Sequence, residues 1–96
     1  MTFVYFTHMP TILIKAGWRF FFYCNEGNEP IHIHCQSAEK ECKFWLISET
    51  YDVEAAYSYS MNSKDIRKVK KIIFENFDYI ESEWKKVHTL KNEKNS

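Results

Sequence analysis

The hydrophobic pattern changes its period once along this chain of 96 residues, and that change limits what the chain can fold into. Over roughly the first two-thirds, apolar and polar side chains alternate with a period of two, as in strands with one buried face. Beyond that, apolar residues recur at steps of three and four, which is typical of an amphipathic helix. Because a chain this short supports only one small core, we predict a single domain in which helix covers sheet.

The alternating part predicts an antiparallel sheet of about four strands. A turn near Ala16 and Gly17 joins the first two strands into a hairpin. A loop of turn-forming residues at 25–30 precedes the third strand, and a short edge strand is expected somewhere between Tyr51 and Ala56. The main strands are expected at residues 11–15, 18–24, 31–36 and 41–47.

The helical part has a clear start signal, and its interior fits two arrangements. Asn62 or Ser63 is a good N-cap, and Asp65 lies in the first turn, where the helix dipole favours an acidic side chain. The apolar stripe is formed by Ile66, Val69, Ile73, Phe77, Ile80, Trp84 and Val87. Asn76 and Asp78 leave open whether this is one long helix or two consecutive helices. The predicted fold class is α+β, with the helix or helices packed on one face of the sheet.

Composition narrows the function classes and the domain limits. Thirteen Lys and Arg residues balance thirteen Asp and Glu residues, which removes the simplest electrostatic case for nucleic acid or an anionic membrane as an obligate partner. Aromatic residues form 18% of the chain, so there are large side chains to bury. We expect residues 1–8 to be an N-terminal extension, residues 9–91 the single α+β domain and residues 92–96 a polar tail.

The cysteines and the apolar segments bear on localisation. Cys24, Cys35 and Cys42 are odd in number and match no zinc or redox spacing, so we expect reduced and mostly buried thiols. No stretch approaches the roughly 18 apolar residues that span a bilayer, and residues 1–8 are too short for a signal peptide. The expected location is the cytoplasm, with no membrane partner.

Two histidines separated by one residue are the strongest functional signal. His32 and His34 project from the same side of the predicted third strand, roughly 7 Å apart by the strand rise. Lys43 and Arg19 are expected on the same exposed sheet face. The simplest interpretation is a solvated or partner-facing polar surface.

Metal binding is one chemical alternative for the histidine pair. A metal ion needs at least a third ligand, and the nearby candidates are Glu26, Glu29 and Glu39. His32, His34 and Glu39 form the set with motif-like spacing. The sequence implies no cofactor other than such a metal.

Acid–base chemistry is the other alternative, and whether the protein is an enzyme stays open. In a metal-independent ribonuclease or phosphoesterase, one of His32 and His34 acts as the base and the other as the acid. Lys43 or Arg19 would then stabilise the charge that develops on phosphorus.

An aromatic group on the same predicted face suggests binding. Phe21, Tyr23 and Trp45 would form an exposed patch, with Glu29 in the preceding loop, and such a patch is typical of a protein interface. The basic helical segment at 64–71 leaves RNA open as a partner. Aromatic-rich edges in so short a chain also favour a homodimer.

Five short segments, taken in chain order, resemble one family. They are Met9-Pro-Thr-Ile12, Arg19-Phe-Phe-Phe-Tyr23, Asn25-Glu-Gly-Asn-Glu-Pro30, His32-Ile-His34 and Lys43-Phe-Trp-Leu46. Together they are similar to a small prokaryotic family known as domain of unknown function 4160, over about residues 9–87. The chain departs from the family pattern at Ile31, where a second proline is usual, and at Cys35, where valine is usual.

The resemblance implies a role only by association. The family pattern starts at the methionine of the first segment, which implies that residues 1–8 are an extension. Genes of this family commonly lie beside another small uncharacterised gene, an arrangement similar to toxin–antitoxin pairs. The resemblance therefore implies a protein-interaction module whose partner is the neighbouring gene product.

Overall fold

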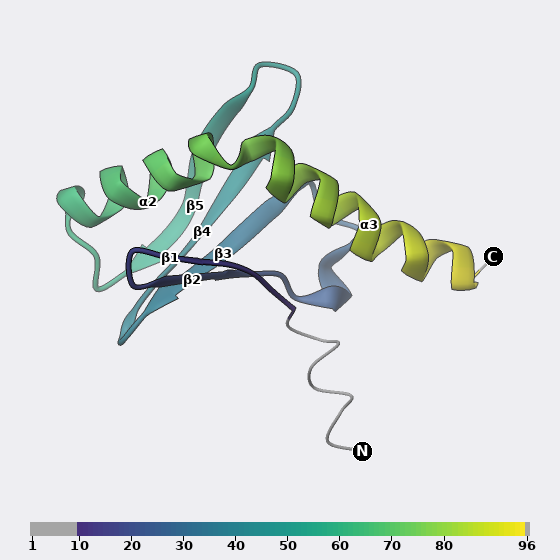
Figure 1. The fold of residues 1–96 in the computed structure, drawn as a ribbon, viewed down its shortest axis with the longest axis horizontal. Helices are drawn as coiled ribbons and strands as arrows, with labels where there is room; N and C mark the ends of the chain where they lie inside the picture. The colour runs from purple at the N-terminus through teal and green to yellow at the C-terminus, as the bar shows by residue number, and fades with distance from the viewer. Residues whose placement is uncertain (1–9, 96) are drawn as a thin grey trace.

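The computed structural model describes residues 10–95, and side chains through His88. The elements in chain order are β1 (Thr11–Lys15), β2 (Trp18–Phe21), the 3-10 helix η1 (Cys24–Glu26), β3 (His32–Ser37), β4 (Lys40–Ile47), β5 (Asp52–Tyr59), α2 (Ser63–Glu75) and α3 (Phe77–Asn95). The fold is α+β, as the change of period predicts (Figure 1). The predicted extension at residues 1–8 lies outside the described residues.

The sheet is an antiparallel meander in which each strand pairs with the next, in the order β1-β2-β3-β4-β5. It has five strands where about four were expected, because β5 is a full strand of eight residues rather than a short edge piece. Its alternation is weak because Val53 is its one buried residue. The pairing with β4 also shifts register between Lys43 and Phe44, which breaks the period of two.

The predicted hairpin turn is present between β1 and β2. Ala16 and Gly17 both have positive φ, at 53° and 83°, which suits a tight two-residue connection between antiparallel strands. A Cβ on Gly17 would meet nothing within 4 Å, so glycine is favoured there by backbone conformation rather than by space.

The helical segment forms two consecutive helices, the second of the two predicted arrangements. Asn62 and Asp65 form a capping box at the start of α2. Asn76 ends α2 by donating from its side chain to the carbonyl of Ile72, and α3 starts at the next residue. Figure 1 shows the two helices crossing one face of the sheet, with α3 continuing past η1 beyond the sheet.

The core lies between this sheet face and the helices. It combines alternate strand residues with the helical stripe: Trp18, Phe20, Phe22, Ile33, Cys35, Cys42, Phe44, Leu46 and Val53 from the strand region, and Val69, Ile72, Ile73, Phe77, Ile80 and Trp84 from the helices. These side chains are at most 5% exposed. Burial of this apolar surface is the main favourable term in the stability of so small a domain.

The three cysteines are free thiols, and two of them are buried. Cys35 and Cys42 are directly opposite each other on β3 and β4, while Cys24 is half-buried in η1. Burial raises the pKa of the Cys35 thiol well above its ordinary value. Among the described helices, none is long and apolar enough to cross a membrane.

Candidate metal centre

The second sheet face is covered in part, by the loop between β2 and β3. β2 ends at Phe21, opposite His34, and the chain then turns through η1 before it returns as β3. Two backbone bonds fix the turn: Glu26 donates to the carbonyl of Tyr23 at 3.2 Å, and Glu29 donates to that of Glu26 at 3.1 Å. The loop therefore lies back over the strand that follows it, and it brings two carboxylates to the histidine pair.

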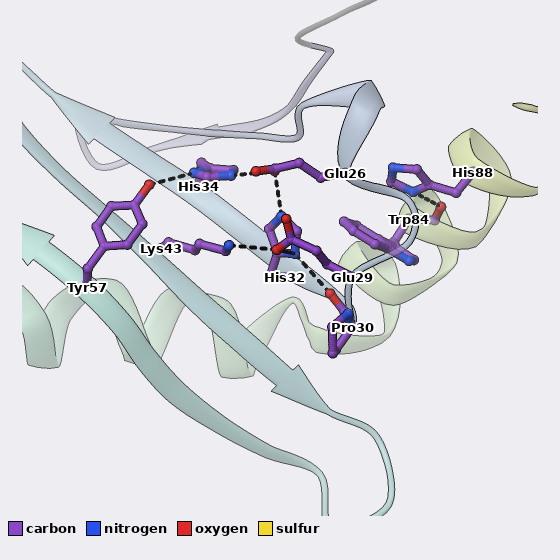
Figure 2. Close-up of polar contacts among 9 residues, drawn as sticks. All are labelled: Glu26, Glu29, Pro30, His32, His34, Lys43, Tyr57, Trp84 and His88. Carbon is purple, nitrogen blue, oxygen red and sulfur yellow. Dashed lines mark hydrogen bonds and ion pairs between the residues drawn. The ribbon is translucent and has the colours of Figure 1, made fainter.

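Glu26 joins both histidines through one oxygen (Figure 2). Its Oε1 is 2.7 Å from Nε2 of His32 and 2.9 Å from Nε2 of His34. All three atoms lie within 4.8 Å of one another. Two imidazole nitrogens and a carboxylate oxygen that converge in this way match the ligands that zinc and iron take in proteins.

The other nitrogen of each ring has an oxygen partner. Nδ1 of His32 donates to the carbonyl of Pro30 at 2.9 Å. Nδ1 of His34 is 3.3 Å from the hydroxyl of Tyr57, which can donate or accept. In metal sites the nitrogen that does not bind the metal is usually held by such an oxygen, which fixes the orientation of the ring.

The hydrogen bonds of His32 leave its Nε2 with two alternatives. Nδ1 must hold a proton because the carbonyl of Pro30 only accepts. Nε2 faces a carboxylate, which also only accepts when it is ionised. Nε2 therefore holds either a second proton, which makes a buried imidazolium, or a lone pair directed at a cation beside Glu26.

Two pKa shifts describe the electrostatics. Burial by itself would raise the pKa of Glu26, but hydrogen bonds from His32 and His34 outweigh it, so the pKa is lowered. Burial lowers the pKa of His34, and the nearby Glu26 offsets part of that effect. Glu26 is therefore held as a carboxylate and His34 is held neutral near pH 7, which are the states in which both bind a metal.

A second ion pair lies beside this cluster. Nζ of Lys43 is 2.8 Å from Oε1 of Glu29 and 4.4 Å from the ring centre of Trp45. Glu29 is also 3.9 Å from Nδ1 of His32, on the side of the ring away from Glu26. The loop thus supplies one carboxylate to the histidines and one to the lysine.

The expectation of an exposed polar face is wrong for the residues at its centre. His32 is 0% exposed, His34 and Phe21 are each 2% exposed, and Lys43 is 9% exposed. The aromatic patch predicted from Phe21, Tyr23 and Trp45 is therefore not an open surface. Phe21 is buried and stacked on His34, and each of the other two rings is half-buried. The period of two predicts that His32, His34 and Lys43 face solvent, whereas the loop buries them.

The remaining predicted site residues lie elsewhere. Glu39 is exposed in the turn that follows β3, at the far end of that strand from His32, and Glu26 takes the place proposed for it. Arg19 lies over the ring of Phe21, 4.3 Å from its centre, and Nε donates to Thr11. The structure therefore brings together His32, His34 and Lys43 with Glu26 and Glu29.

Three residues of the site region were not predicted. Tyr57 reaches His34 from β5, and the ring centres of Trp84 and His32 are 4.7 Å apart. His88 is 4% exposed, and its ring centre is 3.9 Å from that of Trp84. Spacing along one strand gives no signal for contacts made from β5 and α3. The loop offered a usable signal, because the ten residues between β2 and β3 (22–31) are enough to fold back over one of these strands.

His88 has an unusual hydrogen-bond balance. Nδ1 donates to the carbonyl of Trp84 at 2.9 Å, which leaves Nε2 as an acceptor. Within the described part of the chain, Nε2 of His88 is the buried side-chain polar atom that has no hydrogen-bond partner. Such an unpaired group costs about 1–3 kcal/mol.

These features define a small α+β protein with a buried two-histidine, one-carboxylate cluster under a loop. The sequence profile of the family described as Domain of unknown function (DUF4160) matches residues 17–85. The chain belongs to this family, as its five segments indicated. No curated protein and no solved structure matches the chain significantly.

Proposed function

We propose that this protein binds a divalent transition-metal ion through Oε1 of Glu26, Nε2 of His32 and Nε2 of His34. The observation that carries the proposal is that both nitrogens of His32 face oxygens that only accept hydrogen bonds. A cation beside Glu26 removes the need for a buried imidazolium and uses the lone pairs of both rings.

The ligand set favours zinc or ferrous iron over magnesium or calcium. Imidazole nitrogen suits zinc and iron, whereas magnesium and calcium prefer oxygen ligands alone. Neighbouring ligand atoms in a tetrahedral zinc site lie about 3.3 Å apart, given bonds of about 2.0–2.1 Å. The distances of 2.7 Å and 2.9 Å therefore require the carboxylate to move by about half an ångström.

Three protein ligands leave at least one coordination position for water or a small ligand. Structural zinc sites usually have four protein ligands, whereas sites that exchange a ligand have three. The side chain of Glu26 is 22% exposed while those of His32 and His34 are at most 3% exposed. An open position would therefore be reached from the carboxylate side.

The same geometry supports metal binding over a metal-independent ribonuclease. An acid and a base that act on one phosphate must each direct a nitrogen toward the substrate. Here the Nε2 atoms of His32 and His34 both face one carboxylate oxygen, and their Nδ1 atoms are engaged by Pro30 and Tyr57. The protein-interaction role implied by the gene arrangement stays a prediction, since no contact described above bears on it.

Zinc and cobalt titrations of the full chain, purified without a histidine tag, test the proposal. Competition with a chromophoric chelator gives the zinc affinity, and cobalt absorption reports nitrogen and oxygen ligation. Glu26→Gln is expected to lower zinc affinity by about 100-fold, since the ligand loses its charge. Glu39→Gln is the matched control, because it makes the same change at an exposed carboxylate outside the cluster.

Two outcomes would overturn the proposal. One is a wild-type protein, folded by circular dichroism, that binds no zinc, cobalt or ferrous iron above the level of a chelator blank. The other is equal zinc affinity in Glu26→Gln and Glu39→Gln. Glu26→Asp keeps the charge and shortens the side chain, so it distinguishes loss of ligation from loss of folding.

A further inference from the structure

We propose that His88 of α3 is a positioning residue for Glu26, so that metal binding and the docking of α3 on the loop are one coupled event. The inference rests on the proposed metal site and adds an element outside it. Its basis is the contact that α3 makes with the loop directly after Glu26.

Gly27 is where the helix and the loop meet. A Cβ added to Gly27 would lie 2.6 Å from Cδ2 of His88, closer than real contacts allow. The backbone of Gly27 is ordinary, with φ −69° and ψ −12°, so glycine is required there for space alone. The His88 ring therefore lies directly against the residue that follows Glu26, and it sets how closely the loop can approach α3.

Trp84 makes the second link, one turn earlier on the same helix. Its ring centre is 4.7 Å from that of His32 and 3.9 Å from that of His88. Figure 2 shows Trp84 and His88 projecting from α3 beside the loop, with the Trp84 ring next to His32. The helix thus contacts one ligand ring directly and the other ligand through Gly27.

The hydrogen bonds of His88 fit a role in packing rather than in ligation. Its ring is oriented by the bond from Nδ1 to the carbonyl of Trp84, which holds the ring against the indole with the two ring planes tilted by 43°. Nε2 is buried without a partner, so docking of this part of α3 leaves an acceptor unpaired. The contact between His88 and the loop is readily shifted, because it consists mainly of ring packing.

Coupling follows from these contacts and is reciprocal. A bound metal fixes Glu26, which fixes Gly27 and hence the surface on which His88 packs. By linkage, the factor by which docked α3 strengthens metal binding equals the factor by which bound metal strengthens the docking of α3. A variant that undocks α3 is therefore expected to lose this factor in metal affinity. Outer residues that orient metal ligands typically contribute ten- to 100-fold in affinity.

A double-mutant cycle at Gly27 and His88 tests the coupling. Gly27→Ala places a methyl group against the ring and is expected to lower zinc affinity about tenfold. His88→Ala removes the support and is expected to have an effect of similar size. In the double variant the methyl group occupies the vacated space, so its zinc affinity is expected to be no lower than that of His88→Ala alone.

Two controls separate positioning from stability. Gly17→Ala changes the other glycine of the chain, in the distant β1–β2 turn, and Ile80→Val trims a buried core residue one turn before Trp84. Both are expected to lower the melting temperature without changing the zinc affinity of the folded protein. Hydrogen exchange provides a direct readout, since zinc is expected to slow exchange from Trp84 onward in the wild type but not in Glu26→Gln.

The outcomes distinguish this inference from the proposed function. If the wild type binds no metal, the proposed site itself is wrong. If it binds zinc, but His88→Ala and Gly27→Ala bind it equally well, or their effects simply add, the coupling is wrong and the site stands. Loss of affinity in Gly17→Ala to the same extent as in Gly27→Ala would likewise overturn the coupling.

Discussion

Both faces of this sheet bury side chains, one under helices and the other, in part, under a loop, and the two interiors differ in chemistry. One face is covered by α2 and α3, and its interior is apolar. The other is covered by the single loop after β2, and its interior contains two histidines, a lysine and two carboxylates among aromatic rings. The helical side is expected to determine whether the chain folds, whereas the loop side determines what it binds.

The contrast arises from the cost of burying polar groups. Apolar side chains under the helices are stabilised by removal from water and need no particular partners. Each polar group under the loop must find a partner, and the arrangement of His32, Glu26 and Pro30 is accordingly specific. The loop side is therefore the part in which a small displacement changes chemistry rather than stability.

The largest expected change in the free energy of unfolding comes from replacing a buried phenylalanine, and the two sides of the sheet each offer one. Phe44→Ala, on the helical side, is expected to lower the free energy of unfolding by about 3–5 kcal/mol, because the packed helices cannot fill the cavity. Phe21→Ala, under the loop, is expected to cost about 3 kcal/mol or less, because the loop can relax. Urea denaturation measures both, and an equal or reversed order would break the comparison.

The next largest effect is a loss of folding stability at alkaline pH, which the buried thiol of Cys35 on the helical side is expected to cause. Its pKa is raised in the folded protein, whereas in the unfolded chain the thiol ionises near its ordinary value of 9.0. Stability is thus fully present below pH 9 and falls as pH rises beyond it, by up to about 1.4 kcal/mol per pH unit.

The control for this pH effect is Cys35→Val, which removes the ionising group at similar volume. Denaturation curves between pH 8 and about pH 10.5 are expected to show a smaller decline in the variant than in the wild type. An unchanged slope would mean that the decline comes from other groups.

A smaller effect is expected from the ion pair under the loop. Lys43→Met keeps most of the side-chain volume and removes the charge that pairs with Glu29. We expect a loss of about 1 kcal/mol, because Glu29 is 37% exposed and water compensates its carboxylate in part. Chemical denaturation measures it, and adding Glu29→Gln is expected to cost less in this background than in the wild type. Additive losses would argue against a direct pair.

The smallest change in stability is expected for a residue on the loop side of the sheet that the loop does not cover. Ile14 on β1 is 73% exposed. Ile14→Thr keeps the branched Cβ that strands favour and is expected to change stability by less than about 0.5 kcal/mol. Thermal unfolding followed by circular dichroism is sufficient to check it. A loss near that of Phe21→Ala would show that this end of the face is covered as well.

Most of the fold was predictable from local pattern, and most of the site was not. The turn at Ala16 and Gly17, the capping box at Asn62 and the break at Asn76 each depend on residues that are close in the sequence. Burial of the helical side follows from two matching periodicities. β5 was underestimated because its bulge and its exposed edge remove the alternation that marks a strand.

The site could be predicted only in part, for a physical reason. His32 and His34 were found because two ligands on one strand are a local pattern. Glu26 was one of three candidate acids, and the choice among them depends on how the loop turns, which η1 decides. Tyr57 and His88 come from β5 and α3, so only the assembled fold brings them near the histidines.

The position of α3 after the whole sheet in the sequence has a consequence for the order of assembly during synthesis. Each strand of the meander pairs with the strand made just before it, so the sheet can form progressively as the chain leaves the ribosome. Trp84 and His88 emerge only after all five strands. The histidine cluster can therefore form before the helix that contacts it, and a nascent chain is expected to have these ligands paired before α3 packs against His32 and Gly27.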